Sequence, residues 1–204
     1  MKRLITLLFM SVVISGICGY AAESAESILG KAASRINAAK SVTAEYVISS
    51  GQSSEKGRLT MASGKFALTS PSLRTWYDGL TMWTYSPALD EVNITTPTAG
   101  ELLEVNPFAV INNYKTLYSP RLLKSTSDGY MIEMTPLHKG QTFSKAVVTI
   151  NKESFYPSHI RLTLADRSTV DIDIKSVRSG DAISIDTFRF KKSDAPKAEI
   201  IDLR

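Results

Sequence analysis

Two carboxylates stand on one expected strand, Asp171 and Asp173 in the run DIDIK. Side chains at i and i+2 of a strand share a face and lie roughly 7 Å apart. A carboxyl pair at such a separation is the type of group that performs acid–base chemistry on a sugar. The same pattern is typical of the solvated outer face of an amphipathic strand, because separation alone does not perturb a pKa. We therefore expect Asp171 and Asp173 to be surface residues.

Other side chains suited to chemistry are few. The chain has two histidines, His138 in a polar loop and His159 in a strand-like run, without HxH or HxxxH spacing. Such isolated histidines do not indicate a metal site. A GxSxG motif and a glycine-rich phosphate loop are also absent from the sequence. We expect a protein that is not an enzyme and needs neither a metal nor a cofactor.

The N-terminus has the pattern of a secretory signal peptide. Lys2 and Arg3 precede an apolar run of about 14 residues, and the small residues of CGYAA follow it. The run is shorter than the roughly 18–20 apolar residues that span a bilayer. We predict a signal peptide at residues 1–21, cleaved after Ala21, with cleavage after Ala22 as the alternative. Residues 22–204 then form one exported domain.

The only cysteine, Cys18, lies within this segment. A lipid anchor on Cys18 is an alternative, but bacterial lipoproteins carry a small residue before that cysteine and Ile17 occupies the position here. Cleavage leaves a chain without disulfides, which must be stabilised by its core alone. The net charge of +4 includes Lys2 and Arg3, and no basic cluster is interleaved with aromatic residues. We expect no nucleic-acid binding.

Two helical segments are predicted. The first lies within residues 23–40, where Ser24 or Ser27 can cap a helix with apolar residues at helical spacing. The second follows Pro97, where Thr98 and Glu101 fit a capping box and Pro107 separates two short helices. The apolar stripe of the first segment consists of Ile28, Leu29, Ala32, Ala33 and Ile36.

Elsewhere the hydrophobic period is two, which indicates strands separated by turns. The Asp78-Gly79 pair between two such runs predicts a hairpin. The absence of βαβ repeats favours an antiparallel sheet of about 11 strands with helices on one face, a mainly β (α+β) fold. The expected strands are 41–49, 57–63, 65–69, 73–77, 80–86, 91–96, 121–126, 129–135, 144–151, 157–165, 168–178 and 184–190.

Aromatic residues crowd the stretch WYDGLTMWTYSPALDEV, residues 76–92. Neighbouring residues of a strand point to opposite faces, so Trp76 and Tyr77 need apolar surroundings on both sides of the sheet. A sheet with such residues on both faces needs cover on both, or an apolar ligand. Strands roofed by two helical segments are able to enclose a cavity.

Part of this stretch, DGLTMWTYSPALDEV, resembles a segment of the periplasmic outer-membrane lipoprotein carriers of the LolA type. In that family a strand ends in Asp-Gly, and an aromatic strand, a proline and an acidic residue follow. The strands around Tyr46, Leu59 and Phe66 and the tail FRFKKSDAPKAEIIDL also resemble the family in order. The matching residues are Asp78, Gly79, Met82, Trp83, Tyr85, Pro87, Glu91, Phe188, Phe190, Pro196, Ile200, Ile201 and Asp202.

The resemblance implies a half-barrel, a curved antiparallel sheet whose concave face is closed by helices. Its apolar cavity would hold lipoprotein acyl chains. The protein would be a periplasmic monomer that is loaded by an inner-membrane release complex and delivers to an outer-membrane acceptor. A lipid- or lipoprotein-binding sensor of the same fold, without transfer activity, is the alternative. A hydrolase of envelope glycans using Asp171 and Asp173 is the third hypothesis.

We predict that apolar residues of the sheet, the second helical segment and the first helix line the cavity. Members of the family have an arginine that holds the helices shut, where this chain has Ser63, Gly64 and Lys65. Either Lys65 takes the role of that arginine or the helices are held closed in another way. A second departure is Ala198, which stands where the family often has glycine. The predicted lining is Tyr46, Ile48, Leu59, Met61, Phe66, Leu68 and Trp83 from the sheet, Leu102, Leu103, Phe108 and Ile111 from the second segment, and Ile28, Leu29 and Ile36 from the first helix.

Overall fold

The computed structural model describes residues 23–138 and 143–204, so the predicted signal peptide and Cys18 lie outside the described residues. The described chain contains one sheet of twelve strands and a small number of helices. None of these helices is long and apolar enough to cross a membrane. The strands are β1 (Ser41–Ser50), β2 (Ser53–Ala62), β3 (Lys65–Thr69), β4 (Arg74–Tyr77), β5 (Met82–Ser86), β6 (Glu91–Thr95), β7 (Tyr118–Ser125), β8 (Gly129–Pro136), β9 (Phe143–Asn151), β10 (Pro157–Leu164), β11 (Thr169–Gly180) and β12 (Glu199–Asp202).

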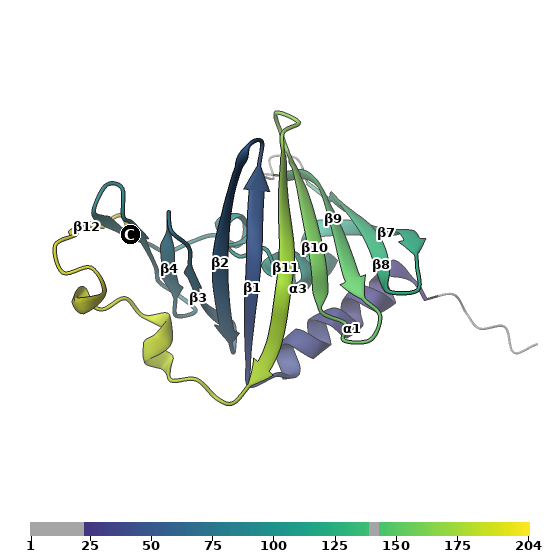
Figure 1. Cartoon of the computed structure of the whole chain (residues 1–204), viewed down its shortest axis with the longest axis horizontal. Coiled ribbons are helices and arrows are strands. Elements are labelled where there is room, and N and C mark those ends of the chain that lie inside the picture. The colour runs from purple at the N-terminus through teal and green to yellow at the C-terminus, as the bar shows by residue number, and fades with distance from the viewer. Residues whose placement is uncertain (1–22, 139–142) are drawn as a thin grey trace, which may run out of the picture.

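The strands follow the order β12-β6-β5-β4-β3-β2-β1-β11-β10-β9-β8-β7 (Figure 1). Two antiparallel meanders, β1–β6 and β7–β11, are joined where β1 pairs with β11. The sheet is open, with β7 and β12 at its edges. The predicted mainly β half-barrel, an open and mostly antiparallel sheet, is confirmed. The exception to the antiparallel pattern is β12, which pairs in parallel with β6.

The first helix, α1 (Ala25–Ala38), begins at Ser24, whose side chain accepts a hydrogen bond from the Ser27 backbone N–H. The predicted apolar stripe is buried, and Figure 1 shows α1 crossing one side of the sheet. The second helical segment is split into α2 (Ala99–Val105), α3 (Ala109–Asn112) and α4 (Tyr114–Leu117). Its predicted Thr98–Glu101 capping box is present, and Pro107 lies between α2 and α3. We call residues 98–117 the lid.

The main core lies between the sheet and these helices, on what we call the inner face. Alternate residues of each strand contribute to it, as the period of two requires. The first meander places Val42, Ala44, Tyr46, Leu59, Met61, Phe66, Leu68 and Met82 there, and the second places Ile132, Met134, Ala146, Val148, Ile150, Ile160, Leu162 and Ile172 there.

The outer face of β3–β6 is covered by residues 181–198, which we call the outer cover (Figure 1, yellow). Val92 of β6 is fully buried against Ala195 and Ala198 of this segment. The expected strand at 184–190 is wrong, because residues Ile185–Phe188 form a 3₁₀ helix capped by the Ser184 hydroxyl. Phe188 of this segment is buried and Phe190 packs on Trp76 of the sheet, so the segment covers the sheet instead of extending it.

Candidate ligand-binding site on the inner face

The inner face contains two cavities beneath the lid. One, which we call the Leu68 cavity, has a volume of about 290 Å³. The other, the Met61 cavity, has a volume of about 250 Å³ and lies near the β2–β3 turn. Tyr46, Ile48, Glu55, Leu68, Ser70, Ser72, Leu73, Leu103, Val105, Pro107, Phe143, Leu162, Leu164, Val170 and Ile172 line the Leu68 cavity. Ile36, Asn37, Ala39, Met61, Ala62, Ser63, Gly64, Lys65, Phe66, Tyr77, Leu102, Asn106, Ala109, Asn112 and Asn113 line the Met61 cavity.

The predicted lining residues are divided between these cavities and the packed core. Tyr46, Ile48, Leu68 and Leu103 line the Leu68 cavity. The Met61 cavity is lined by Ile36, Met61, Phe66 and Leu102. Other predicted residues are wholly buried and contribute to the shared core without bordering a cavity, namely Ile28, Leu29, Leu59, Phe108 and Ile111.

Trp83 requires a correction. It pairs with Trp76 across β4 and β5, whereas its neighbour Met82 pairs with Tyr77 and is buried in the inner core. Adjacent strand residues face opposite ways, so Trp83 lies on the outer face. There it packs on the cluster formed by Val92, Ala195 and Ala198. The expectation that Trp83 faces the cavity is therefore wrong by one residue of strand register.

The second meander also contributes to the Leu68 cavity, which was not predicted from the sequence. Phe143, Leu162 and Leu164 from β9 and β10 line it together with Val170 and Ile172 from β11. The alternating apolar residues in HIRLTL and TVDIDI carry this signal, since each run predicts one apolar strand face. The signal alone does not place these residues at the cavity, because pairing between β1 and β11, which brings the two meanders together, is a long-range contact.

A polar cluster lies at one end of the Leu68 cavity. The Glu55 carboxylate accepts hydrogen bonds from the hydroxyls of Ser70, at 3.0 Å, and Ser72, at 2.8 Å, and from the Ser72 backbone N–H at 3.3 Å. Burial, with a smaller effect of the Glu55 charge, raises the pKa of Tyr46 to about 12. The phenol that borders this cavity therefore remains neutral at physiological pH, while the carboxylate stays tied to the β3–β4 turn.

The lid is tied down by Tyr114 and Asn106. The Tyr114 hydroxyl donates to the Glu26 backbone carbonyl of α1 at 3.1 Å. The Asn106 amide lies 3.7 Å from the Met61 sulfur, and its oxygen accepts from the Phe108 backbone N–H at 3.0 Å. Lys65 donates instead to the Ser63 carbonyl of its own turn, at 3.5 Å. Lys65 borders the Met61 cavity beside lid residues, but its hydrogen bond in the described structure goes to its own turn.

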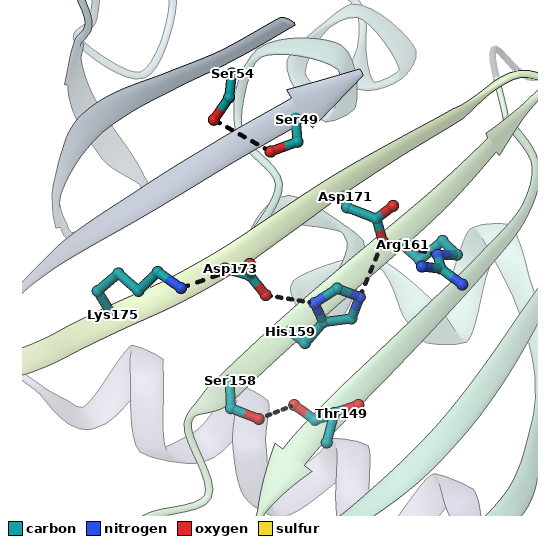
Figure 2. A network of polar contacts seen from close by, with 9 residues as sticks. All are labelled: Ser49, Ser54, Thr149, Ser158, His159, Arg161, Asp171, Asp173 and Lys175. Carbon is teal, nitrogen blue, oxygen red and sulfur yellow. Dashed lines mark hydrogen bonds and ion pairs between the residues drawn. The ribbon is translucent and has the colours of Figure 1, made fainter. Parts of the chain in front are cut away.

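The candidate acid–base pair lies on the outer face, away from both cavities. Figure 2 shows His159 between Asp171 and Asp173, with Nε2 at 3.1 Å from the first carboxylate and Nδ1 at 2.8 Å from the second. Arg161 also contacts Asp171, at 2.7 Å. The His159 hydrogen bond lowers the pKa of Asp173 most, against a smaller effect of burial. Cross-strand pairing of β10 with β11 creates this arrangement.

This network has the geometry of a structural cluster. Both ring nitrogens of His159 face carboxylates, so in this arrangement neither is directed at a hydroxyl nucleophile. As predicted, Asp171 and Asp173 are partly solvent-exposed side chains of the outer face. In the described ranges, no group of three or more His, Cys, Asp or Glu side chains is arranged to hold a metal ion.

Solved structures share this fold at low sequence identity. An uncharacterised conserved protein from Thermus thermophilus superposes with a TM-score of 0.62 at 11% identity, covering 87% of this chain and 98% of its own. A DUF1329 family protein from Desulfovibrio piger gives a TM-score of 0.50 at 13% identity, with 85% and 100% covered. A LolA superfamily protein from Nitrosomonas europaea gives a TM-score of 0.45 at 15% identity, and the match covers 83% of this chain and 99% of that protein.

No curated protein matches the sequence significantly. A family match does cover most of the chain, because residues 16–166 match the family described as outer membrane lipoprotein carrier protein LolA. This match spans α1, the lid and the strands up to β10, and so includes most residues that line the two cavities. The chain belongs to the LolA family of outer membrane lipoprotein carrier proteins.

Proposed function

We propose that this protein is a periplasmic carrier that binds the acyl chains of lipoproteins on its inner face and shuttles them from the inner to the outer membrane. The observation that carries the proposal is the Leu68 cavity, an apolar space bordered by both strand meanders and by the lid. The proposed partners are an inner-membrane release complex and an outer-membrane acceptor. The protein would act as a monomer, without a cofactor and without catalysis.

The physical need for such a cavity follows from acyl-chain hydration. Each CH₂ group exposed to water costs about 0.8 kcal/mol, so a lipoprotein with two or three acyl chains does not cross an aqueous compartment unaided. A carrier must bury the chains and remain polar outside. On the second meander, the ion pairs of Asp171 and of Glu133 with Arg121 supply that polar exterior.

The cavities also indicate that the lid must move. Their volumes, about 290 and 250 Å³, are at or below the low end of the range of roughly 300–1,000 Å³ that is typical of ligand pockets. Several acyl chains therefore need α2–α4 to shift away from the sheet. The lid helices are short and are tied to α1 by the Tyr114 hydrogen bond. A lid that is able to leave the sheet has a closed and an open state, and similar free energies of the two would allow both loading and release.

A transfer assay tests this proposal. Inner-membrane vesicles carrying a labelled lipoprotein are incubated with the protein, and the label is followed into the soluble fraction and then into acceptor membranes. The test variant is Leu73→Asp at the border of the Leu68 cavity. Its matched control is Leu80→Asp, because Leu80 is 68% exposed in the β4–β5 turn. We expect Leu73→Asp to lower transfer about tenfold or more, equivalent to about 1.4 kcal/mol of binding, and Leu80→Asp to leave it unchanged.

Three results distinguish the alternatives. Binding of lipoprotein without delivery to acceptor membranes would replace the carrier by the lipid- or lipoprotein-binding sensor. If the protein releases no lipoprotein and native mass spectrometry finds it free of lipid after expression, the acyl-chain proposal fails. An Asp171→Ala, Asp173→Ala variant that retains full function in cells would exclude the hydrolase hypothesis.

A further inference from the structure

The sheet has a notch beside the Leu68 cavity. Strand β3 pairs with β2 only from Arg58 to Ala62, whereas β2 pairs with β1 along its whole length from Ser53. In the described structure, the β2 residues 53–57 thus have a strand partner on one side alone. Across the gap lies the β3–β4 turn, which is held by the Glu55 hydrogen bonds to Ser70 and Ser72. Side chains and a turn, not a ladder of backbone hydrogen bonds, separate the two faces here.

A groove of about 860 Å³ lies on the outer side of this notch. Tyr46 and Ser70 border both this groove and the Leu68 cavity. At this point the Tyr46 ring and the Gly57 backbone separate the groove from the cavity. A Cβ at position 57 would lie 2.3 Å from Cζ of the Tyr46 ring. The ring therefore packs directly over the Gly57 backbone. The groove and the cavity meet at the neutral Tyr46 ring and at Ser70.

The groove is basic. Lys56, Arg58, Arg74 and Lys175 line it, and Glu45 is the acidic residue among the side chains that border it. Arg58 is paired with Glu45 at 2.9 Å, and Lys175 lies 3.5 Å from Asp173 outside the groove.

Two of these cations are not neutralised by a carboxylate. Within the described part of the chain, neither Lys56 nor Arg74 has a carboxylate within ion-pair distance. Arg74 instead lies over the Tyr85 ring at 5.8 Å and donates to the Asp194 backbone carbonyl at 3.4 Å. Clustered cations with low-dielectric walls attract anions.

We propose that the notch admits an anionic amphiphile, with its acyl chain in the Leu68 cavity and its phosphate or carboxylate head in the groove beside Lys56 and Arg74. The inference rests on the proposed acyl-chain function and specifies the ligand class. The placement of charge fixes the orientation: the Glu55 carboxylate on the cavity side repels an anionic head, and the cations on the outer side attract it. In this orientation the acyl chain is buried in the cavity while the anionic head pairs with the cations of the groove.

Three probes separate the parts of this inference. Palmitoyl lysophosphatidylglycerol carries both a chain and an anionic head, monopalmitoylglycerol carries the chain without the charge, and glycerol 3-phosphate carries the head without the chain. Their affinities are measured by calorimetry below the micelle concentrations. We expect the anionic lipid to bind about tenfold more tightly than the neutral one. Because exposed charges are screened by salt, this ratio should fall towards one at about 0.5 M salt. Glycerol 3-phosphate alone should bind at least about a hundredfold more weakly.

Variants assign the preference to the groove. Lys56→Ala with Arg74→Ala should bring the anionic lipid to the affinity of the neutral lipid and leave the neutral lipid unaffected. Lys56→Gln alone, at an exposed residue, should lower the affinity for the anionic lipid about threefold. This single variant leaves Arg74 in place, so its result does not depend on the contact of Arg74 with the outer cover. The control is Lys124→Ala, on β7 at the far edge of the sheet, which should change neither affinity.

The outcomes are distinct. Equal affinity for the two lipids, or an anionic preference that survives in the double variant, overturns this inference and leaves the acyl-chain proposal standing. Binding of glycerol 3-phosphate as tight as that of the anionic lipid also overturns it, because the groove would then be an anion site independent of the cavity. If neither acylated probe binds, the proposed function fails and this inference fails with it.

Discussion

Two covers lie on the two sides of the first meander, and they are built differently. The lid covers the inner face and leaves two cavities beneath it. The outer cover, residues 181–198, packs on β3–β6 with Trp76 against Phe190 at 5.5 Å and Val92 in a fully buried cluster. An ion pair of 3.0 Å between Arg189 and Asp78 also fastens this segment to the β4–β5 turn.

The proposed function requires the lid to open, whereas the outer cover is expected to stay closed. Both satisfy the same requirement, because strands with apolar residues on both faces need shielding on both. The outer cover combines aromatic packing with an ion pair, and those contacts stabilise the fold. The lid has short helices and a hydrogen bond from Tyr114 to α1. Four predictions test this contrast, in decreasing order of expected effect.

Val92→Asp should have the largest effect. It places an unpaired carboxylate among Ala195 and Ala198 in the buried outer cluster, and a buried unpaired charge destabilises by about 3–5 kcal/mol. Urea unfolding followed by tryptophan fluorescence measures the loss. The matched control is Val147→Asp on β9, half-buried, which should cost less than about 1 kcal/mol. If the two variants lost equal free energy of unfolding, the outer cover would not be a tightly packed, stabilising cover.

Phe190→Ala should have the next largest effect. It removes the ring that packs edge-on against Trp76, and we expect a loss of about 2 kcal/mol because the side chain is half-buried. Thermal unfolding checks the stability, and a red shift of the emission checks the exposure of the indole. Ile185→Ala in the same segment is the control, since Ile185 is 46% exposed and should cost less than about 0.5 kcal/mol.

Asp78→Asn should lower stability by about 1–2 kcal/mol at pH 7, through loss of the charged hydrogen bond to Arg189. Burial alone would raise the pKa of Asp78, but hydrogen bonds from the Thr81 and Leu80 backbone N–H groups and from Arg189 outweigh it and hold the pKa below its usual value. A lowered folded-state pKa stabilises the protein above the unfolded pKa of about 4, and this contribution is lost progressively as the pH falls from there through the folded-state pKa.

Urea unfolding at pH 7 and pH 3 measures this dependence on Asp78. The difference between the native protein and Asp78→Asn should be smaller at pH 3. Asp128→Asn provides a matched control, because Asp128 also precedes a glycine but has an exposed side chain in the β7–β8 turn. A difference for Asp78→Asn that is independent of pH would show that the ion pair to Arg189 does not fasten the outer cover.

Tyr114→Phe should have the smallest effect on stability, about 1 kcal/mol, because it removes the hydrogen bond to the Glu26 carbonyl and keeps the ring. The same change should speed uptake of a fluorescent fatty-acid probe, since it loosens the lid. Tyr118→Phe is the control: the buried Tyr118 hydroxyl has no partner in the described structure, so its removal should cost nothing. Uptake that is equally fast in both variants would contradict a tether at Tyr114.

The sequence predicted the elements well because their signals are local. Alternation of apolar residues identified most strands, and the Thr98–Glu101 pair with Pro107 identified the start and the break of the lid. The Asp78-Gly79 turn was also predictable, and Gly79 has the positive φ, 102°, that such a turn requires. These features depend on residues within a few positions of one another.

Side-chain direction and distant pairing were harder to predict. The inner or outer orientation of Trp83 depends on one residue of register, and the local pattern around it is apolar on both sides. The position of His159 between two aspartates depends on the pairing of β10 with β11. The outer cover was mistaken for a strand, because Phe188 and Phe190 alternate with polar residues in the same way as strand residues do.

The parallel pairing of β12 with β6 has a consequence for how the protein folds. Glu199 lies beside Glu91, so β12 and the outer cover reach their places only after a chain closure of more than a hundred residues. Contacts of such sequence separation form slowly. Until they form, Trp76, Trp83 and Tyr85 are left without the segment that shields them, and intermediates with exposed apolar surface are prone to aggregate. The final step of folding is thus expected to be the docking of the outer cover, which both tryptophans would report.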